Sequence, residues 1–167
     1  EEIVLTGKYK SSILYAPYGQ AELDQAREML ASIGGQELIG RSYASLSQGE
    51  KQLLLIARSL MEKPELLILD EATSGLDLFA RERLLDQIGK ITQMDQAPTI
   101  LYVTHHVEEI TAAMDHVLLL KEGEIIAQGP KEDILQKVVM DRFYPQPVEL
   151  IELGEDRYFV KVEVRSS

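Results

Sequence analysis

Cysteine is absent from the 167 residues, which excludes a disulfide framework and any metal site built on thiolates. Long apolar runs are absent as well, since no stretch approaches the ~18–20 residues of a transmembrane helix. The first residues lack the pattern of a secretory signal peptide. The chain begins at Glu1 rather than at methionine, and we expect it to be cut or processed from a longer protein.

Basic residues are scarce. The chain has 17 Lys and Arg against 28 Asp and Glu, which gives a net charge of −11. Because a nucleic-acid surface needs a basic face, this balance argues against direct contact with nucleic acid or with anionic lipid headgroups. It leaves open docking onto another protein at a membrane. The length and the 45% hydrophobic content suit one domain with a real core.

The most informative segment is Leu66–Asp77. Aliphatic residues run into two carboxylates, Asp70 and Glu71, and a small-residue turn leads to a third, Asp77. The apolar run predicts a strand over Leu66–Leu69 that is buried on both faces. Because burying an unpaired charge is unfavourable, we expect Asp70 and Glu71 at the strand end beside a cleft. There Asp70 can hold Mg²⁺ and Glu71 can position or deprotonate water.

Apolar spacing and turn formers predict the other elements. Helices are expected over Ala21–Ile33, Lys51–Met61, Leu76–Ile91, Val107–Met114 and Lys131–Lys137. A second buried strand is expected over Thr99–Thr104. Two β-hairpins are expected after it, one that pairs His116–Lys121 with Glu124–Gln128 and a terminal one that pairs Val148–Leu153 with Arg157–Val164. Strand and helix alternate in the centre, which favours an α/β fold with parallel strands.

A serine–glycine turn precedes the helix predicted over Lys51–Met61, and Gly49 or Glu50 is expected to begin that helix. Ser47 followed by Glu50 has the spacing of a capping box, which needs no ligand. The same turn suits a phosphate, because a helix N-terminus offers free N–H groups, Ser47 a hydroxyl, and Gly49 close approach. On these residues alone, capping is the stronger interpretation.

His105 follows the predicted strand Thr99–Thr104. An imidazole at a strand's carboxyl end, level with the two carboxylates, suits a hydrogen bond to a γ-phosphate. A lone histidine there is more often a structural hydrogen-bonding group. Because strand residues alternate, His106 is expected to point elsewhere, and a metal site made of both histidines is not expected. His116 is interpreted as structural.

In order and spacing, these elements resemble the later half of the ATPase domain of an ATP-binding-cassette (ABC) transporter, over roughly Val4–Gln136. The matching parts are Leu46–Glu50 (ABC signature), Leu66–Asp70 (Walker B), Glu71 (catalytic glutamate), Ser74–Asp77 (D-loop) and His105 (switch histidine). The signature departs from the family pattern, since Gln48 replaces the usual first glycine and Glu50 the usual glutamine. Ser47 and Gly49 are retained.

The resemblance implies an α/β, partial P-loop NTPase fold with a mostly parallel sheet, flanking helices, part of the helical subdomain and a C-terminal β-hairpin. It divides the chain into three parts. Residues 1–63 form a partial helical subdomain with the signature, residues 64–144 form the C-terminal part of the ATPase core, and residues 145–167 form an extension. ATP and Mg²⁺ are the implied cofactors. The implied residues are Glu71 and His105 for catalysis, Asp70 for the metal, and Ser47, Gln48, Gly49, Glu50 and Asp77 for the nucleotide. Asp77 also suits a helix N-cap.

The resemblance also implies partners. They are a second ABC ATPase subunit in a head-to-tail dimer and a separate transmembrane permease, which would hold the protein at the cytoplasmic face of the membrane. The segments Thr73–Asp77 and Thr104–Ile110 resemble transporter ATPases, the second especially import-type ones. The segment Leu14–Gln36 is expected in the helical subdomain that touches the membrane subunits.

The glycine-rich phosphate loop G-x-x-x-x-G-K-[ST] occurs nowhere in the 167 residues. Gly7-Lys8 lacks a glycine five residues earlier, and Tyr9 follows it. We therefore expect a C-terminal part of a longer ATPase that hydrolyses no ATP by itself. Missing neighbour strands would leave the two predicted strands uncovered, which favours self-association or strand exchange.

Two other functions remain open. One is a non-transport ABC ATPase of the ribosome-associated or DNA-repair kind. Glu50, between Gly49 and Lys51, supports it, because the resemblance implies that these groups often carry a glutamate there. A non-catalytic regulatory module is opposed by the intact Glu71 and His105. The energising subunit of a transporter is the favoured interpretation, and the transported substrate is not readable from these motifs.

Overall fold

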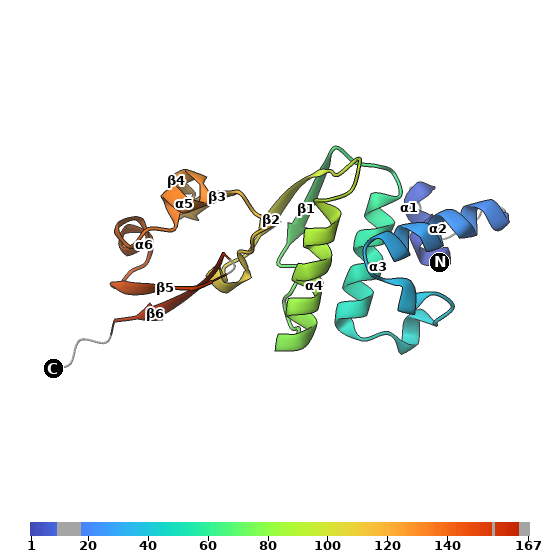
Figure 1. Cartoon of the computed structure of the whole chain (residues 1–167), viewed down its shortest axis with the longest axis horizontal. Coiled ribbons are helices and arrows are strands. Elements are labelled where there is room, and N and C mark those ends of the chain that lie inside the picture. The colour runs from blue at the N-terminus through green and yellow to red at the C-terminus, as the bar shows by residue number, and fades with distance from the viewer. Residues whose placement is uncertain (10–17, 155, 164–167) are drawn as a thin grey trace. The chain divides into compact units, whose positions relative to one another are not determined.

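The computed structural model describes residues 1–9, 18–154 and 156–163. The chain divides into two units, Glu1–Thr104 and His105–Ser167, whose elements are labelled in Figure 1. Each unit has its own buried hydrophobic cluster. Within the described ranges, no helix combines the length and the apolar character that crossing a membrane requires. The predicted division at residues 63 and 144 stays a prediction.

Helices dominate the first unit. They are α1 (Glu2–Lys8), α2 (Gln20–Ser32), α3 (Gln48–Leu60) and α4 (Leu78–Ile91), with 3₁₀ turns η1 (Gln36–Leu38) and η2 (Tyr43–Ser45). The predictions of α2 and α4 are confirmed, and α1 was not predicted. Helix α3 begins at Gln48, just before the predicted start at Gly49 or Glu50, because the Ser47 side chain accepts the Glu50 N–H.

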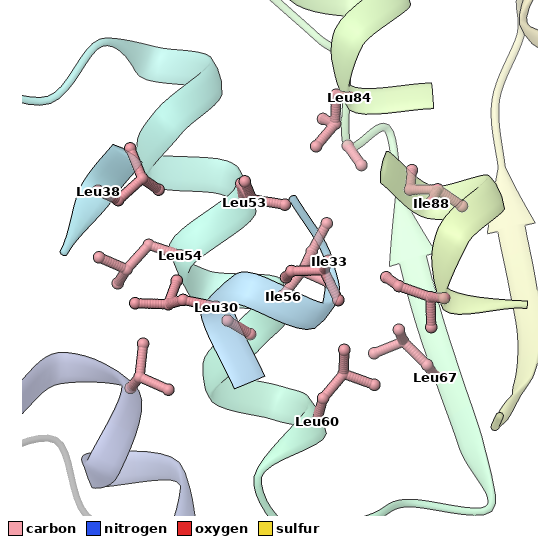
Figure 2. Packing of buried hydrophobic residues seen from close by; sticks show 14 of the residues in the cluster. Leu30, Ile33, Leu38, Leu53, Leu54, Ile56, Leu60, Leu67, Leu84 and Ile88 are labelled. Atoms are coloured by element: carbon pink, nitrogen blue, oxygen red, sulfur yellow. The ribbon is translucent and has the colours of Figure 1, made fainter. Parts of the chain in front are cut away.

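The apolar faces of α2, α3 and α4 meet in one core, in which α3 lies centrally (Figure 2). Its labelled members are Leu30, Ile33, Leu38, Leu53, Leu54, Ile56, Leu60, Leu67, Leu84 and Ile88. Full burial of a side chain of this kind contributes roughly 1.5–3 kcal/mol. This core fixes the N-termini of α3 and α4 and the strand that carries Leu67.

Strands β1 (Leu66–Asp70) and β2 (Thr99–Val103) pair in parallel, as predicted, and this pair is the α/β core of the unit. The prediction that β1 is buried on both faces is wrong, and so is the prediction that β2 is a buried strand. Leu67 and Leu69 are buried in the core, whereas the opposite face exposes 43–57% of each of its apolar side chains, which are Leu66, Ile68, Leu101 and Val103. The reason is that this sheet has two strands among the described residues, and the helical core packs against one face.

This apolar sheet face predicts concentration-dependent self-association of the 167-residue chain, because exposed apolar strands pair readily with other chains. Light scattering over a concentration series measures it. Ile68→Lys is expected to restore the monomer, since it places a charge at the centre of the face. Leu78→Lys is the matched control, because Leu78 is equally exposed, 57%, but lies on α4. A parent chain that stays monomeric at high concentration contradicts the prediction.

Hairpins and short helices form the second unit. Its elements are η3 (Val107–Glu109), β3 (His116–Lys121), β4 (Glu124–Pro130), α5 (Lys131–Ile134), α6 (Lys137–Phe143), β5 (Val148–Gly154) and β6 (Arg157–Val162). Both predicted hairpins are confirmed, as β3 pairs antiparallel with β4 and β5 with β6. Glu122 and Gly123 have φ of 53° and 84°, as a two-residue hairpin turn requires. The predicted end at Val164 lies outside the described residues, as do the first residues of Leu14–Gln36.

One helix prediction in this unit is wrong, and a second is confirmed only over Lys131–Ile134. The segment Val107–Met114 forms only the 3₁₀ turn η3, because Ile110 is extended and the Thr111 hydroxyl accepts the Ala113 N–H in place of a helical carbonyl. The segment Lys131–Lys137 breaks into α5 and the start of α6. There Ile134 and Leu135 are both buried, although consecutive side chains on a helix point about 100° apart.

Candidate functional site

The strand β1 ends at the predicted carboxylates. Asp70 is its last residue and Glu71 follows directly, and both side chains are exposed. Glu71 has φ of +46°, a left-handed conformation that is uncommon outside glycine. It is held there because its N–H donates to Val103 O at 2.9 Å and its carbonyl accepts the Ser74 N–H at 2.9 Å. Sparsely populated backbone of this kind clusters at functional sites.

The turn after Glu71 is tied to the neighbouring strand. Thr73 is buried, and its hydroxyl lies 3.2 Å from the Tyr102 hydroxyl of β2. Gly75 at φ 75° completes the turn. Asp77 then caps α4, since its Oδ1 accepts the Ala80 N–H at 2.9 Å. The predicted N-cap role of Asp77 is confirmed.

The capping box at Ser47 is also confirmed. The Ser47 Oγ accepts the Glu50 N–H at 3.3 Å, and Glu50 Oε2 accepts the Ser47 N–H at 2.7 Å. Arg41 forms an ion pair with the same carboxylate. Its guanidinium, together with the Ser47 N–H, lowers the pKa of Glu50 below the ordinary 4.5. Ser47 and Gln48 remain exposed to solvent.

This lowered pKa predicts acid-dependent stability. Because the folded pKa of Glu50 lies below its unfolded value, the stabilisation is fully present above about pH 4.5 and is lost as the pH falls through the folded value. Glu50→Gln keeps the capping geometry and removes the charge, so we expect a loss below about 1 kcal/mol at pH 7 that vanishes in acid. Urea unfolding over a pH series that descends from pH 7 measures it, and Arg41→Ala should give the same profile. A loss that stays constant over the whole series would contradict the assignment.

A pocket of about 210 Å³ lies where the N-termini of α3 and α4 meet. A Cβ built on Gly49 would lie 3.4 Å from the Ala80 Cβ, which shows how close the two helices are here. The structure thus brings together four predicted residues, which are Ser47, Gly49, Glu50 and Asp77. Gln48, Asp70 and Glu71 do not line this pocket, and His105 belongs to the second unit.

Sequence reasoning missed several residues of this pocket. Phe79, Arg83 and Gln87 line it from α4, and Glu37 lines it from η1. Their signal in the sequence is the i, i+4, i+8 spacing, which places the three α4 residues on one helix face. Arg83 Nη1 lies 3.1 Å from Glu37 Oε1, an ion pair over 46 residues that no local pattern indicates.

His105 lies at the start of the second unit and is exposed. Its ring centroid lies 4.0 Å from that of His106, with the planes tilted by 42°. The prediction that His106 points elsewhere is therefore wrong. Strand alternation does not apply, because β2 already ends at Val103.

Among residues 1–9, 18–154 and 156–163, no three His, Asp or Glu side chains cluster as a protein-only metal site would require. Mg²⁺ is usually bound through one or two carboxylates together with substrate phosphates. The exposed Asp70 carboxylate at a strand end fits that donor set. The exposed hydroxyl of Ser47 and the half-buried Gly49 fit an anionic ligand at a helix N-terminus.

A family model described as "ABC transporter" matches residues 5–74. An ABC transporter ATP-binding protein of Streptococcus mutans is 65% identical over 164 residues, which are 98% of this chain and 63% of that protein. A second, from Lactococcus lactis, is 56% identical over 160 residues, or 96% of this chain and 61% of the relative. The molybdenum import ATP-binding protein of Escherichia coli K12 is 36% identical over 131 residues, or 77% of this chain and 37% of the relative.

The structural comparison agrees. An ABC transporter of metal-chelate type, solved in an inward-facing conformation, has a TM-score of 0.79 and 26% identity to this chain. The match covers 98% of this chain and 66% of the transporter's chain. An ATP-binding cassette in its ADP conformation shares the fold, with a TM-score of 0.70 and 22% identity. The match covers 84% of this chain and 58% of that one. The fold is thus that of part of an ABC ATPase domain. The chain spans about three fifths of the length of its first curated relatives.

Proposed function

We propose that this protein binds and hydrolyses ATP to energise transport through a separate membrane permease. The premise is that the chain belongs to the family of ABC transporter ATP-binding proteins. One observation carries the proposal. Consecutive carboxylates, Asp70 and Glu71, emerge at the carboxyl end of a strand that pairs in parallel with its neighbour, which is where α/β folds bind their ligands.

The two carboxylates have different roles in this proposal. Asp70 would hold Mg²⁺, which supplies neutralisation of phosphate charge when bound. Glu71 accepts the proton of the attacking water and orients that water, as a general base does. The left-handed turn at Glu71, fixed by hydrogen bonds to Val103 and from Ser74, limits how far its carboxylate moves.

The N-terminus of α3 contributes to a nucleotide held by a second ATPase subunit in a head-to-tail dimer. Ser47 offers its exposed hydroxyl, and the neighbouring Gln48 and Glu50 frame the turn. A Cβ at Gly49 would make an ordinary contact with Ala80 at 3.4 Å, so packing does not demand glycine there. Glycine leaves the backbone amide open to a phosphate, and this supports the anion-binding role.

Two further residues complete the assignment. His105 donates a hydrogen bond to the γ-phosphate, a role that the family resemblance assigns and that its exposure permits. Asp77 lies beside Ser47 and Gly49 in the pocket and contacts the partner subunit. Because the molybdenum relative is named as an import protein, we favour import. The protein then lies at the cytoplasmic face of the membrane and binds it only through the permease.

A chimera tests the function. The chain replaces the matching 164 residues of the Streptococcus mutans relative, and phosphate release from Mg-ATP is measured for the chimera, for the parent relative and for the 167-residue chain alone. The chimera is expected to hydrolyse ATP at a rate near the parent's. The chain alone is expected to show none above background, because its sequence has no phosphate loop. Hydrolysis by the parent but not by the chimera would overturn the proposal.

A further inference from the structure

We infer that the C-terminal hairpin β5–β6, anchored by Lys131, positions the segment that carries His105. Part of this inference, the effect on hydrolysis, rests on the proposed function. The hairpin lies beyond residues 5–74, the part that matches the family model. Its role therefore has to come from its own contacts within the second unit.

The hairpin shares a buried core with the turn that follows His105. Strand β6 packs against η3, and Val107 and Ile110 lie in the same hydrophobic cluster as Val148 of β5 and Tyr158 of β6. All four side chains are at most 9% exposed. Because such cores are closely packed, a shift of the hairpin displaces η3.

Lys131 connects the same two parts with polar contacts. Its side chain is 8% exposed, and its Nζ lies 3.2 Å from Asp156 Oδ2 in the turn between β5 and β6. The same ammonium donates to Thr111 O at 3.1 Å, and the Lys131 backbone N–H donates to Asp115 O at 2.8 Å. A buried charge needs these partners, so one cation holds the hairpin turn and the loop after η3 together.

Local contacts carry the position of η3 to His105. The carbonyl of His106 accepts the Glu109 N–H at 3.1 Å and so forms the start of η3. His106 Nδ1 lies 3.5 Å from Glu108 Oε1, and its ring contacts the His105 ring at 4.0 Å. The exposed His105 is thus attached to a turn whose Val107 is buried. A displacement of about 1 Å in a group of this kind can cost ~100-fold in rate.

The first test uses the 167-residue chain and the ¹H–¹³C signals of its histidine rings. Lys131→Met keeps the aliphatic stem and removes the ammonium, so the His105 ring signals should shift while the methyl signals of the first unit stay unchanged. Lys131→Arg should restore them, since arginine keeps the charge facing Asp156. Lys121→Met is the matched control, because Lys121 Nζ donates to Phe143 O at 2.7 Å and so ties β3 to α6 rather than to the hairpin.

Asp156→Asn removes the same ion pair from the exposed side, since Asp156 is 51% exposed, and it keeps the test decisive if Lys131→Met does not fold. Unchanged His105 signals in a folded variant of either kind would overturn the inference.

In the chimera, Lys131→Met should lower kcat at least about tenfold with KM for ATP within about twofold. If His105→Ala leaves hydrolysis intact, the catalytic role of His105 fails, whereas the ring signals still decide whether the hairpin positions it.

Discussion

Replacing Glu71 with glutamine in the chimera is expected to lower kcat for Mg-ATP by about 10²- to 10⁴-fold, the usual contribution of a general base. Glutamine has nearly the same shape but cannot accept the proton of the attacking water. The backbone at Glu71 is held by the Val103 carbonyl and the Ser74 N–H, so the turn should survive the change. Binding of ATP is therefore expected to stay within about twofold, which fluorescence of a labelled nucleotide measures beside phosphate release.

Glu65→Gln provides the matched control for this experiment. Glu65 directly precedes β1 at its opposite end, its side chain is exposed, and the substitution changes the net charge equally. Hydrolysis should be unchanged in this variant. A Glu71→Gln protein that keeps more than a tenth of the parent kcat would remove Glu71 from the role of general base. Equal losses in both variants would point to an effect of charge rather than of position.

The carboxylate end of β1 was predictable because local rules decide it. Four aliphatic residues followed by Asp70 and Glu71 have few other arrangements, since charges avoid the core. The caps at Ser47 and Asp77 were equally readable, because a capping side chain bonds to an N–H three residues later. The order of these features along the chain, more than any single one, indicated the family.

Contacts between distant segments were not predictable. The exposure of Ile68 depends on which elements cover the sheet, and an apolar strand sequence looks the same with one covered face as with two. The pocket beside Gly49 depends on Phe79 and on the ion pair of Arg83 with Glu37. Such side chains are unremarkable until the fold places them together.

The segment after His105 shows a third limit. Its apolar spacing fits a helix, yet Val107 and Ile110 are buried against a hairpin that begins some forty residues later. Tertiary packing overrides the weak helix preference of β-branched residues. The hairpin itself was predicted, whereas its packing on η3 was not, and that packing is the basis for assigning it a positioning role.

Gly7→Ala is expected to destabilise the first unit by about 3 kcal/mol or more, the upper range for overpacking a core. A Cβ at Gly7 would lie 1.9 Å from the carbonyl oxygen of Arg58 and 2.8 Å from its carbonyl carbon. These are backbone atoms of α3, which cannot rotate away as a side chain does. Helix α1 would have to separate from α3, and Val4 and Leu5, both 0% exposed, would leave the core.

This expectation opposes the intrinsic preference of the residue, since alanine favours a helix over glycine by about 1 kcal/mol. Urea unfolding followed by circular dichroism measures the loss, and hydrogen exchange in α1 locates it. Gly19→Ala is the matched control, because a Cβ there meets only the flexible end of Glu22 at 3.3 Å. If Gly7→Ala is as stable as this control, α1 does not pack on α3 through Gly7. A large loss confined to Gly7→Ala would show that close backbone approach, rather than helix propensity, selects glycine at this position.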